Sequence, residues 1–151
     1  IARLGRTLKR WQTAFLAYRA PGKQLIRWAW RTMWTQDNAS DPPVVNSDQN
    51  WTVQPGIKVG STALTTGVGM AIQADNEFLY LVYTAQSTFV LQQALVPLTD
   101  LSNWRGNVPI SIVDSTLIPK SQSAPGFLIG QQMALVVYPG QIQPHLLEAW
   151  V

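Results

Sequence analysis

The chain has 151 residues, of which 46% are apolar and 13% are charged, and its formal net charge is +3. That apolar content excludes a disordered chain, and the charged share is about half of the usual one. Because cysteine is absent, disulfides and thiolate metal sites are excluded. The sequence also lacks the ~18 consecutive apolar residues that a helix spanning a bilayer requires.

Charge is distributed unevenly along the chain. Residues 1–34 contain eight of the eleven basic residues, no Asp or Glu, and four of the seven tryptophans. The formal charge is therefore +8 for residues 1–34 and −5 for residues 35–151. A stretch of this kind is typical of a surface that meets a polyanion or an anionic membrane.

The first part of this basic stretch has the spacing of a helix. Leu4, Leu8, Trp11, Phe15 and Tyr18 follow one another at intervals of four and three residues. This spacing is that of the apolar seam of an amphipathic helix, with basic and polar residues beside it.

A second helix is predicted after the break at Pro21-Gly22. Lys23, Arg27 and Arg31 recur at every fourth position, which would place a basic stripe along about three turns of helix. We therefore predict a basic, Trp-rich helical arm over residues 1–34.

The next segment, residues 35–56, has no periodicity. It contains Pro42-Pro43 and Pro55-Gly56 among many Asn, Asp and Ser residues. This composition predicts a linker or an extended strap.

From residue 57 onward the pattern is that of β-strands. Short runs rich in β-branched and aromatic residues alternate with turn residues, and a hairpin is predicted around the turn at residues 85–87. The predicted strands are residues 62–73, 77–84, 88–96, 110–113, 127–129 and 133–138, and residues 142–151 are either a last strand or a loose clamp. The fold class is mainly β: an antiparallel β-sandwich or jelly-roll-like barrel over residues 57–151 with an N-terminal helical arm.

The arm supplies the first set of candidate contact residues. Its cations could neutralise phosphates while its indoles stack on bases, or both could lie at a lipid interface. Alternatively, the arm packs its apolar seam on the β-domain and leaves its basic face in water. The candidate residues for contact with a polyanion or a membrane are Arg3, Arg6, Lys9, Arg10, Arg19, Lys23, Arg27, Arg31, Trp11, Trp28, Trp30 and Trp34.

A loop at residues 102–107 supplies the second set. Trp104 stands next to Arg105 and between Asn103 and Asn107. Such a loop could stack on a sugar or a base, or anchor a partner protein. The alternative, that Trp104 folds back and covers the end of the β-domain, is favoured because loop tryptophans often fill such ends.

The sequence offers little for catalysis. His145 is the only histidine, so neither a zinc site nor a familiar triad is supported, and the eight carboxylates are scattered. The Gly67-Val68-Gly69 stretch continues as a strand pattern, which favours a bulge or a close backbone approach over nucleotide binding. We expect a protein that is not an enzyme and that has no cofactor.

In its organisation the whole chain resembles small virion structural proteins of the coat, spike or decoration type. The shared features are a basic arm free of acidic residues, a Pro- and Asx-rich strap, and a β-domain that is poor in charge and lacks cysteine. The resemblance implies a structural subunit of a virus particle. Its partners would be copies of itself and other structural subunits, and residues 1–34 would hold it to the genome, an inner membrane or a neighbouring subunit. Its expected location is the virion.

Two other functions remain open at this point. One is a carbohydrate-binding or membrane-attaching β-sandwich module, which would be membrane-associated in the second case. The other is a subunit of a membrane or organellar complex whose basic arm grips RNA or lipid.

Overall fold

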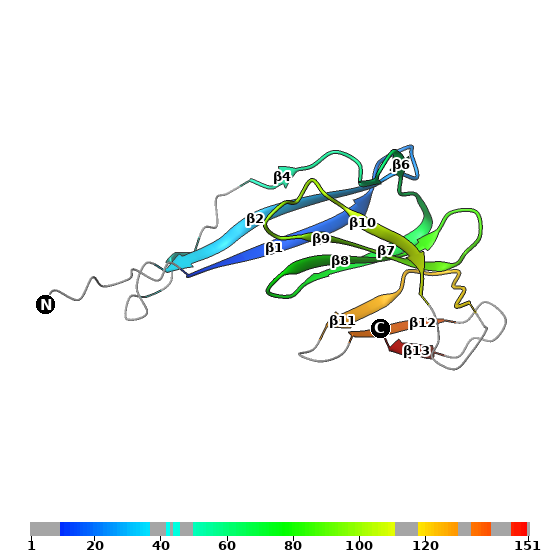
Figure 1. The fold of residues 1–151 in the computed structure, drawn as a ribbon. Helices are drawn as coiled ribbons and strands as arrows, with labels where there is room; N and C mark the ends of the chain where they lie inside the picture. Colours follow the sequence, from blue (N-terminus) through cyan, green and yellow to red (C-terminus); the bar gives the residue numbers. More distant parts are fainter. Residues whose placement is uncertain are drawn as a thin grey trace, which may run out of the picture.

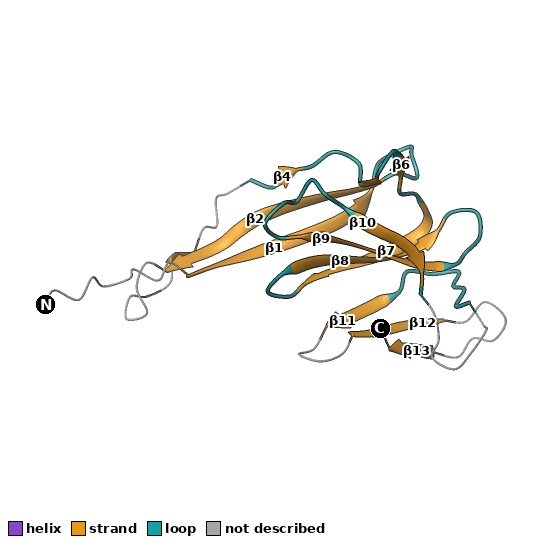
Figure 2. Cartoon of the chain, in the orientation of Figure 1, coloured by secondary structure: helices purple, strands orange, loops and turns teal. Residues whose placement is uncertain are grey.

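The computed structural model describes residues 10–36, 42, 44–45, 50–110, 118–129, 134–139 and 146–150. These described residues contain strands, turns and loops but no helix, as Figure 2 shows. The protein is mainly β, with several antiparallel sheets packed together, and this part of the predicted fold class is confirmed.

Thirteen strands are present in the described residues, in four antiparallel sheets (Figure 1). The hairpin sheet comprises β1 (Arg10–Arg19), β2 (Ile26–Gln36), β3 (Val44–Val45) and β4 (Thr52–Val53). The central sheet, in the order β10-β9-β8-β7, comprises β7 (Thr66–Ala74), β8 (Phe78–Ala85), β9 (Leu91–Pro97) and β10 (Arg105–Pro109). The C-terminal sheet comprises β11 (Gly126–Ile129), β12 (Ala134–Pro139) and β13 (Leu146–Trp150). A small hairpin comprises β5 (Lys58–Val59) and β6 (Thr62–Ala63).

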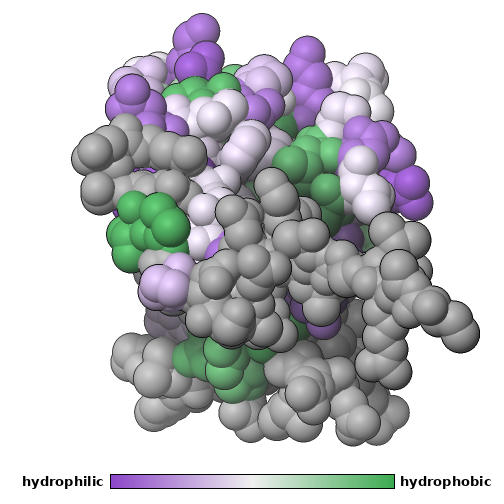
Figure 3. Space-filling model, turned by 90° about the vertical axis from the view of Figure 1, so that its left-hand side faces the viewer, coloured by the Kyte–Doolittle hydropathy of each residue, from purple (hydrophilic) through white to green (hydrophobic). Residues whose placement is uncertain are grey.

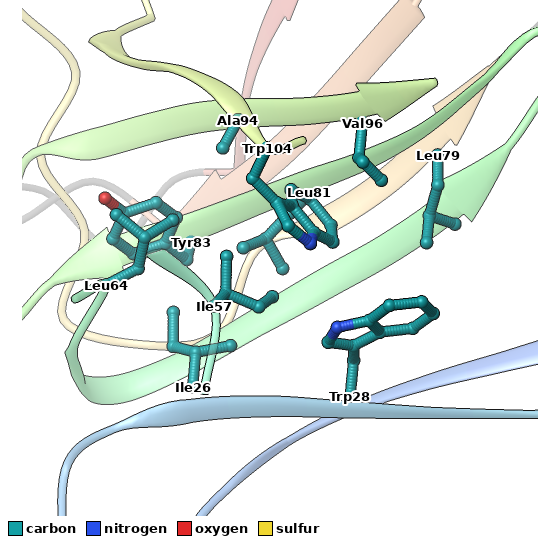
Figure 4. Packing of buried hydrophobic residues seen from close by; sticks show 10 residues of the cluster. All are labelled: Ile26, Trp28, Ile57, Leu64, Leu79, Leu81, Tyr83, Ala94, Val96 and Trp104. Carbon is teal, nitrogen blue, oxygen red and sulfur yellow. The ribbon is translucent and has the colours of Figure 1, made fainter. Parts of the chain in front are cut away.

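The central sheet packs on both of its faces. On one side Leu79, Leu81 and Val96 share a core with Ile26 and Trp28 of β2. Figure 4 shows these side chains, with Trp28 extending from β2 towards Trp104. Since successive residues of a strand point to opposite faces, a strand between two layers has apolar residues throughout.

A second core lies on the opposite face of the central sheet. Val82 of β8 and Leu91 of β9 pack there with Val136 and Tyr138 of β12. The run of apolar residues at 78–83, which lies in the predicted strand at residues 77–84, therefore belongs to a strand covered on both sides. This explains why that run shows no polar alternation.

The predicted helical arm is wrong for residues 10–34, which form the β1–β2 hairpin instead. Pro21 and Gly22 occupy its turn, where the N–H of Lys23 donates to the carbonyl of Ala20 at 3.1 Å. Gly22 has a φ of +66°, as position i+2 of a type II turn requires. The predicted Leu4 and Leu8 positions lie outside the described residues.

The hairpin is favoured over helices because its two faces differ at a period of two. Ile26, Trp28 and Trp30 of β2 contribute to the core, whereas the intervening Arg27 is exposed. Aromatic and β-branched residues favour strands when one face is buried. The four-residue spacing of Arg27 and Arg31 fits this alternation as well, since four is a multiple of two.

The predicted strap at residues 35–56 contains β3 and β4, and both pair with β2. Its described parts therefore run along the hairpin sheet. The predicted boundaries at residues 34 and 56 stay predictions.

One strand of the central sheet, β10, begins in a segment that was predicted to be a loop. β10 pairs with β9 from Arg105 onward, and its register shifts between Gly106 and Val108. Gly106 and Asn107 have φ values of +88° and +69°, so the bulge consists of residues that tolerate this conformation. The turn-like composition that predicted a loop is the composition of this bulge.

The predicted bulge at residues 67–69 is confirmed, because the β7–β8 register shifts between Thr66 and Met70. The buried hydroxyl of Thr66 accepts the N–H groups of Val68 and Gly69 and donates to the carbonyl of Gly69. The backbone at Gly69 also lies close to Ala124, since a Cβ added at Gly69 would lie 2.5 Å from the Cβ of Ala124.

Candidate assembly surface

The tryptophans of the hairpin that were predicted to contact a partner point mainly into the protein. Trp28 is 3% exposed, and Trp30 is partly buried against the same core. Trp34 is partly buried as well. Trp28 is therefore part of the core, while Trp30 and Trp34 keep part of their surface exposed.

The opposite side of the hairpin sheet, called the outer face here, has an apolar row across its strands. Leu16 of β1 pairs with Ala29 of β2, and Ala29 pairs with Val53 of β4. Leu16 is 44% exposed and Val53 is 58% exposed, whereas Ala29 between them is 2% exposed. Exposed apolar side chains gathered in this way mark a surface that meets another molecule.

Cationic residues border this apolar row on both sides. Arg27 pairs with Tyr18 on one side, and Arg31 pairs with Ala14 on the other. Arg27 is exposed and Arg31 is half-buried. The outer face therefore combines an apolar centre with positive charge at its border.

Arg31 is held in place by its neighbours. Its guanidinium lies over the ring of Trp51 at 5.1 Å from the centroid, and its Nε donates to the Sδ of Met33 at 3.3 Å. A cation over an indole is attracted by the ring and loses freedom of movement. Trp51 precedes β4 and was not among the predicted contact residues, because nothing in the sequence joins it to Arg31.

Two further predicted cations lie at the hairpin turn. Arg19 and Lys23 are both exposed, and Nη1 of Arg19 donates to the carbonyl of Gly67 at 3.1 Å. They border a shallow hollow of about 220 Å³. The predicted residues Arg3, Arg6 and Lys9 and the side chains of Arg10 and Trp11 lie outside the described residues.

The predicted ligand loop is divided between the core and the surface. Trp104 is 6% exposed and contacts Trp28 edge to face, so its ring is folded back into the core. That it covers the end of the β-domain stays a prediction. A hollow of about 380 Å³ lies beside the two rings. Asn103 and Arg105 are exposed, whereas the side-chain oxygen of Asn107 accepts the hydroxyl of Tyr83. These four residues do not form one exposed site.

A cleft of about 790 Å³ lies between the hairpin sheet and the central sheet, at the end of the molecule away from the hairpin turn. It is called the acidic cleft here because Asp75 lines it and because Glu77 and Asp100 are next to lining residues in the chain. Phe15, Trp30 and Leu98 are among its apolar lining residues, and Asp75 and Asn76 are among the polar ones. Figure 1 places the β7–β8 and β9–β10 turns towards this end, and Figure 3 shows both apolar and polar side chains at its surface.

The carboxylates near the cleft are stabilised in their ionised form. Burial raises the pKa of Asp75, but hydrogen bonds from the N–H groups of Phe78 and Glu77 and from the hydroxyl of Tyr80 more than offset it and lower the pKa overall. Hydrogen bonds from the hydroxyl and N–H of Ser102 lower the pKa of Asp100. This end therefore carries negative charge at neutral pH.

The described residues contain no group of three or more His, Cys, Asp and Glu side chains suited to a metal ion, and His145 lies outside them. Within the same part of the chain, no helix has the length and apolar character to cross a membrane. Comparison with protein-family models, with curated proteins and with solved structures finds no match.

Proposed function

We propose that this protein is a non-enzymatic structural subunit of a virus particle. Its basic hairpin would join it to neighbouring subunits. One observation carries the proposal. The hairpin directs Trp28 and Trp30 into the core and presents Arg27 and Arg31 around an apolar row whose two ends are exposed. A surface that is both apolar and charged suits a protein partner, because each kind of group finds a complement there.

The composition of the chain supports the same proposal. A protein with only 13% charged residues has few groups that keep its surface hydrated, which favours burial of that surface in an assembly. The finer fold proposal is an antiparallel β-sandwich, supported by the packing on both faces of the central sheet. The order of β7 to β10 is a meander, so a jelly-roll-like barrel would require crossing connections elsewhere in the chain.

The carbohydrate-binding alternative receives less support. It relied on Trp104 as an exposed stacking ring, and Trp104 is buried. The membrane and nucleic-acid alternatives relied on the exposure of several tryptophans, and Trp28 is buried. They remain as outcomes of the experiment that follows.

Sedimentation velocity of the full chain at increasing concentration and low salt tests the proposal, with electron microscopy of the products. We expect species much larger than a monomer, with regular form. A chain that stays monomeric at every concentration contradicts the proposal. In parallel mixtures with single-stranded RNA or anionic vesicles, saturable binding without self-association would favour those partners instead.

A further inference from the structure

The outer face of the hairpin sheet requires a partner surface that is both apolar and acidic. Leu16 and Val53 are exposed on either side of the buried Ala29, and Arg27 and Arg31 border them. A polynucleotide would match the arginines but leave the aliphatic row without a complement. A partner protein with carboxylates around an apolar recess would match both.

The same chain has such a recess at the acidic cleft. Its walls include Phe15, Trp30, Leu98 and Leu101. Asp75 lies at its rim, and the N–H of Leu98 donates to the carbonyl of Glu77 at 2.8 Å, which ties the β7–β8 turn to the loop that carries Asp100. Asp75, Glu77 and Asp100 are all exposed.

We propose that the outer face of one copy docks into the acidic cleft of a second copy. This inference rests on the proposed function, because it names the contact by which the subunits would join. Arg27 and Arg31 would meet carboxylates of the cleft rim, and Leu16 and Val53 would cover its apolar walls.

This contact has a consequence for the form of the assembly. The two surfaces differ, so the contact is heterologous. After one docking event the first copy still has a free acidic cleft and the second copy still has a free outer face. Heterologous contacts produce closed rings or open arrays instead of isolated dimers. A repeating structure therefore follows from a single type of contact.

Charge reversal on each surface provides the test. The first variant carries Arg27→Glu and Arg31→Glu on the outer face. The second carries Asn76→Lys, Glu77→Lys and Thr99→Lys, which reverse the sign of the cleft rim without replacing the turn-forming Asp75 and Asp100. A control with Lys58→Glu and Lys120→Glu matches the charge change of the first variant at exposed sites elsewhere.

Sedimentation velocity of the full-length chains is the readout, and circular dichroism checks that each variant is folded. We expect each of the two variants to associate at least about tenfold more weakly than the wild type, and the control to associate as the wild type does. An equimolar mixture of the two variants should regain large assemblies, because every reversed surface then finds a complement. If the glutamate variant is unfolded, Arg27→Gln with Arg31→Gln replaces it and should weaken association.

The remaining outcomes overturn the proposal in distinguishable ways. If folded variants assemble as the wild type does, the docking contact is wrong while the proposed function stands. A mixture that stops at one-to-one dimers indicates contact between like surfaces, and a mixture that stays dissociated excludes the cleft as the partner of the outer face. A wild-type chain that never self-associates overturns both the contact and the proposed function.

Discussion

Trp28 of β2 and Trp104, which precedes β10, meet edge to face, with ring centroids 6.0 Å apart and ring planes at 75°. This contact joins the hairpin sheet to the loop between β9 and β10. Nε1 of Trp104 is buried and has no hydrogen-bond partner among the described residues. Such a donor costs about 1–3 kcal/mol, so the apolar packing of the indole must outweigh that cost.

Two substitutions of Trp104 distinguish the stability gained from packing of its ring from the cost of its unpaired N–H group. Trp104→Phe removes the N–H and keeps an aromatic ring, so the free energy of unfolding should fall by only about 1–2 kcal/mol. Trp104→Ala leaves a large cavity and should cost about 3–5 kcal/mol. Urea denaturation measures both values. Equal losses of unfolding free energy in the two variants would mean that packing of an aromatic ring at this position contributes nothing to stability.

Gly69 and Gly67 form a matched pair in the β7 bulge. Gly69→Ala would place a Cβ 2.5 Å from the Cβ of Ala124 and 3.1 Å from its Cα, so the backbone must shift. We expect a loss of about 1–3 kcal/mol in the free energy of unfolding. Gly67→Ala meets its nearest atom, the carbonyl oxygen of Gln86, only at 3.6 Å and should stay within about 0.5 kcal/mol of the wild type. A Gly69→Ala variant as stable as Gly67→Ala would contradict the close approach.

The raised pKa of Tyr83 predicts how the free energy of unfolding changes at alkaline pH. Burial raises the pKa of Tyr83 from 10.0 to about 12. Because the unfolded chain releases this proton first, the stabilisation is complete below pH 10 and is lost as the pH rises towards 12, by up to about 2 kcal/mol. Denaturation series across this range should show the decline. In Tyr83→Phe the decline should be smaller, and an unchanged slope would exclude Tyr83 as its source.

The lowered pKa of Asp75 predicts that stability is lost in the other direction, as the pH falls into the acidic range. Its pKa is lowered overall, since the hydrogen bonds that it accepts more than offset the effect of burial. Its contribution to stability is therefore present above the ordinary pKa of an aspartate, 3.8, and is lost as the pH falls through the lower pKa of the folded state. Thermal unfolding between pH 2 and pH 6 measures this loss. Asp75→Asn should reduce the pH dependence; if it does not, the carboxylate is not linked to folding.

The strands of the body follow closely from their residues. Leu81 and Val82 lie in the predicted strand at residues 77–84, and the structure places their side chains in two different cores on opposite faces of it. The residues of β10 were harder to assign, because Gly106 and Asn107 have the composition of a turn and occupy a bulge. Composition alone does not separate these two uses of the same residues.

The hairpin was misassigned because two periods coincide in its sequence. Arg27 and Arg31 are four residues apart, which suits one face of a helix as well as one face of a strand. The alternation of Ile26, Trp28 and Trp30 with other residues was the signal for a strand, and the concentration of aromatic residues supported it. Tertiary packing decided between helix and strand, since Trp28 lies in the same core as Leu79 and Trp104.

The candidate surface was predictable only in part. The basic character of Arg27 and Arg31 is visible in the sequence, whereas the apolar row between Leu16 and Val53 depends on strand pairing over more than thirty residues of chain. The acidic cleft likewise joins Phe15 and Trp30 to Asp75. Such juxtapositions arise from long-range register, which no local pattern encodes.

Site-specific cross-linking tests the docking of the outer face into the acidic cleft most directly, because the chain has no cysteine of its own. One full-length chain carries Val53→Cys on the outer face, and another carries Thr99→Cys at the cleft. Mild oxidation of their mixture should link residue 53 of one chain to residue 99 of the other, as identified by peptide mass spectrometry. Links between two copies of residue 53 alone, or no links under conditions in which the chains assemble, would contradict the account.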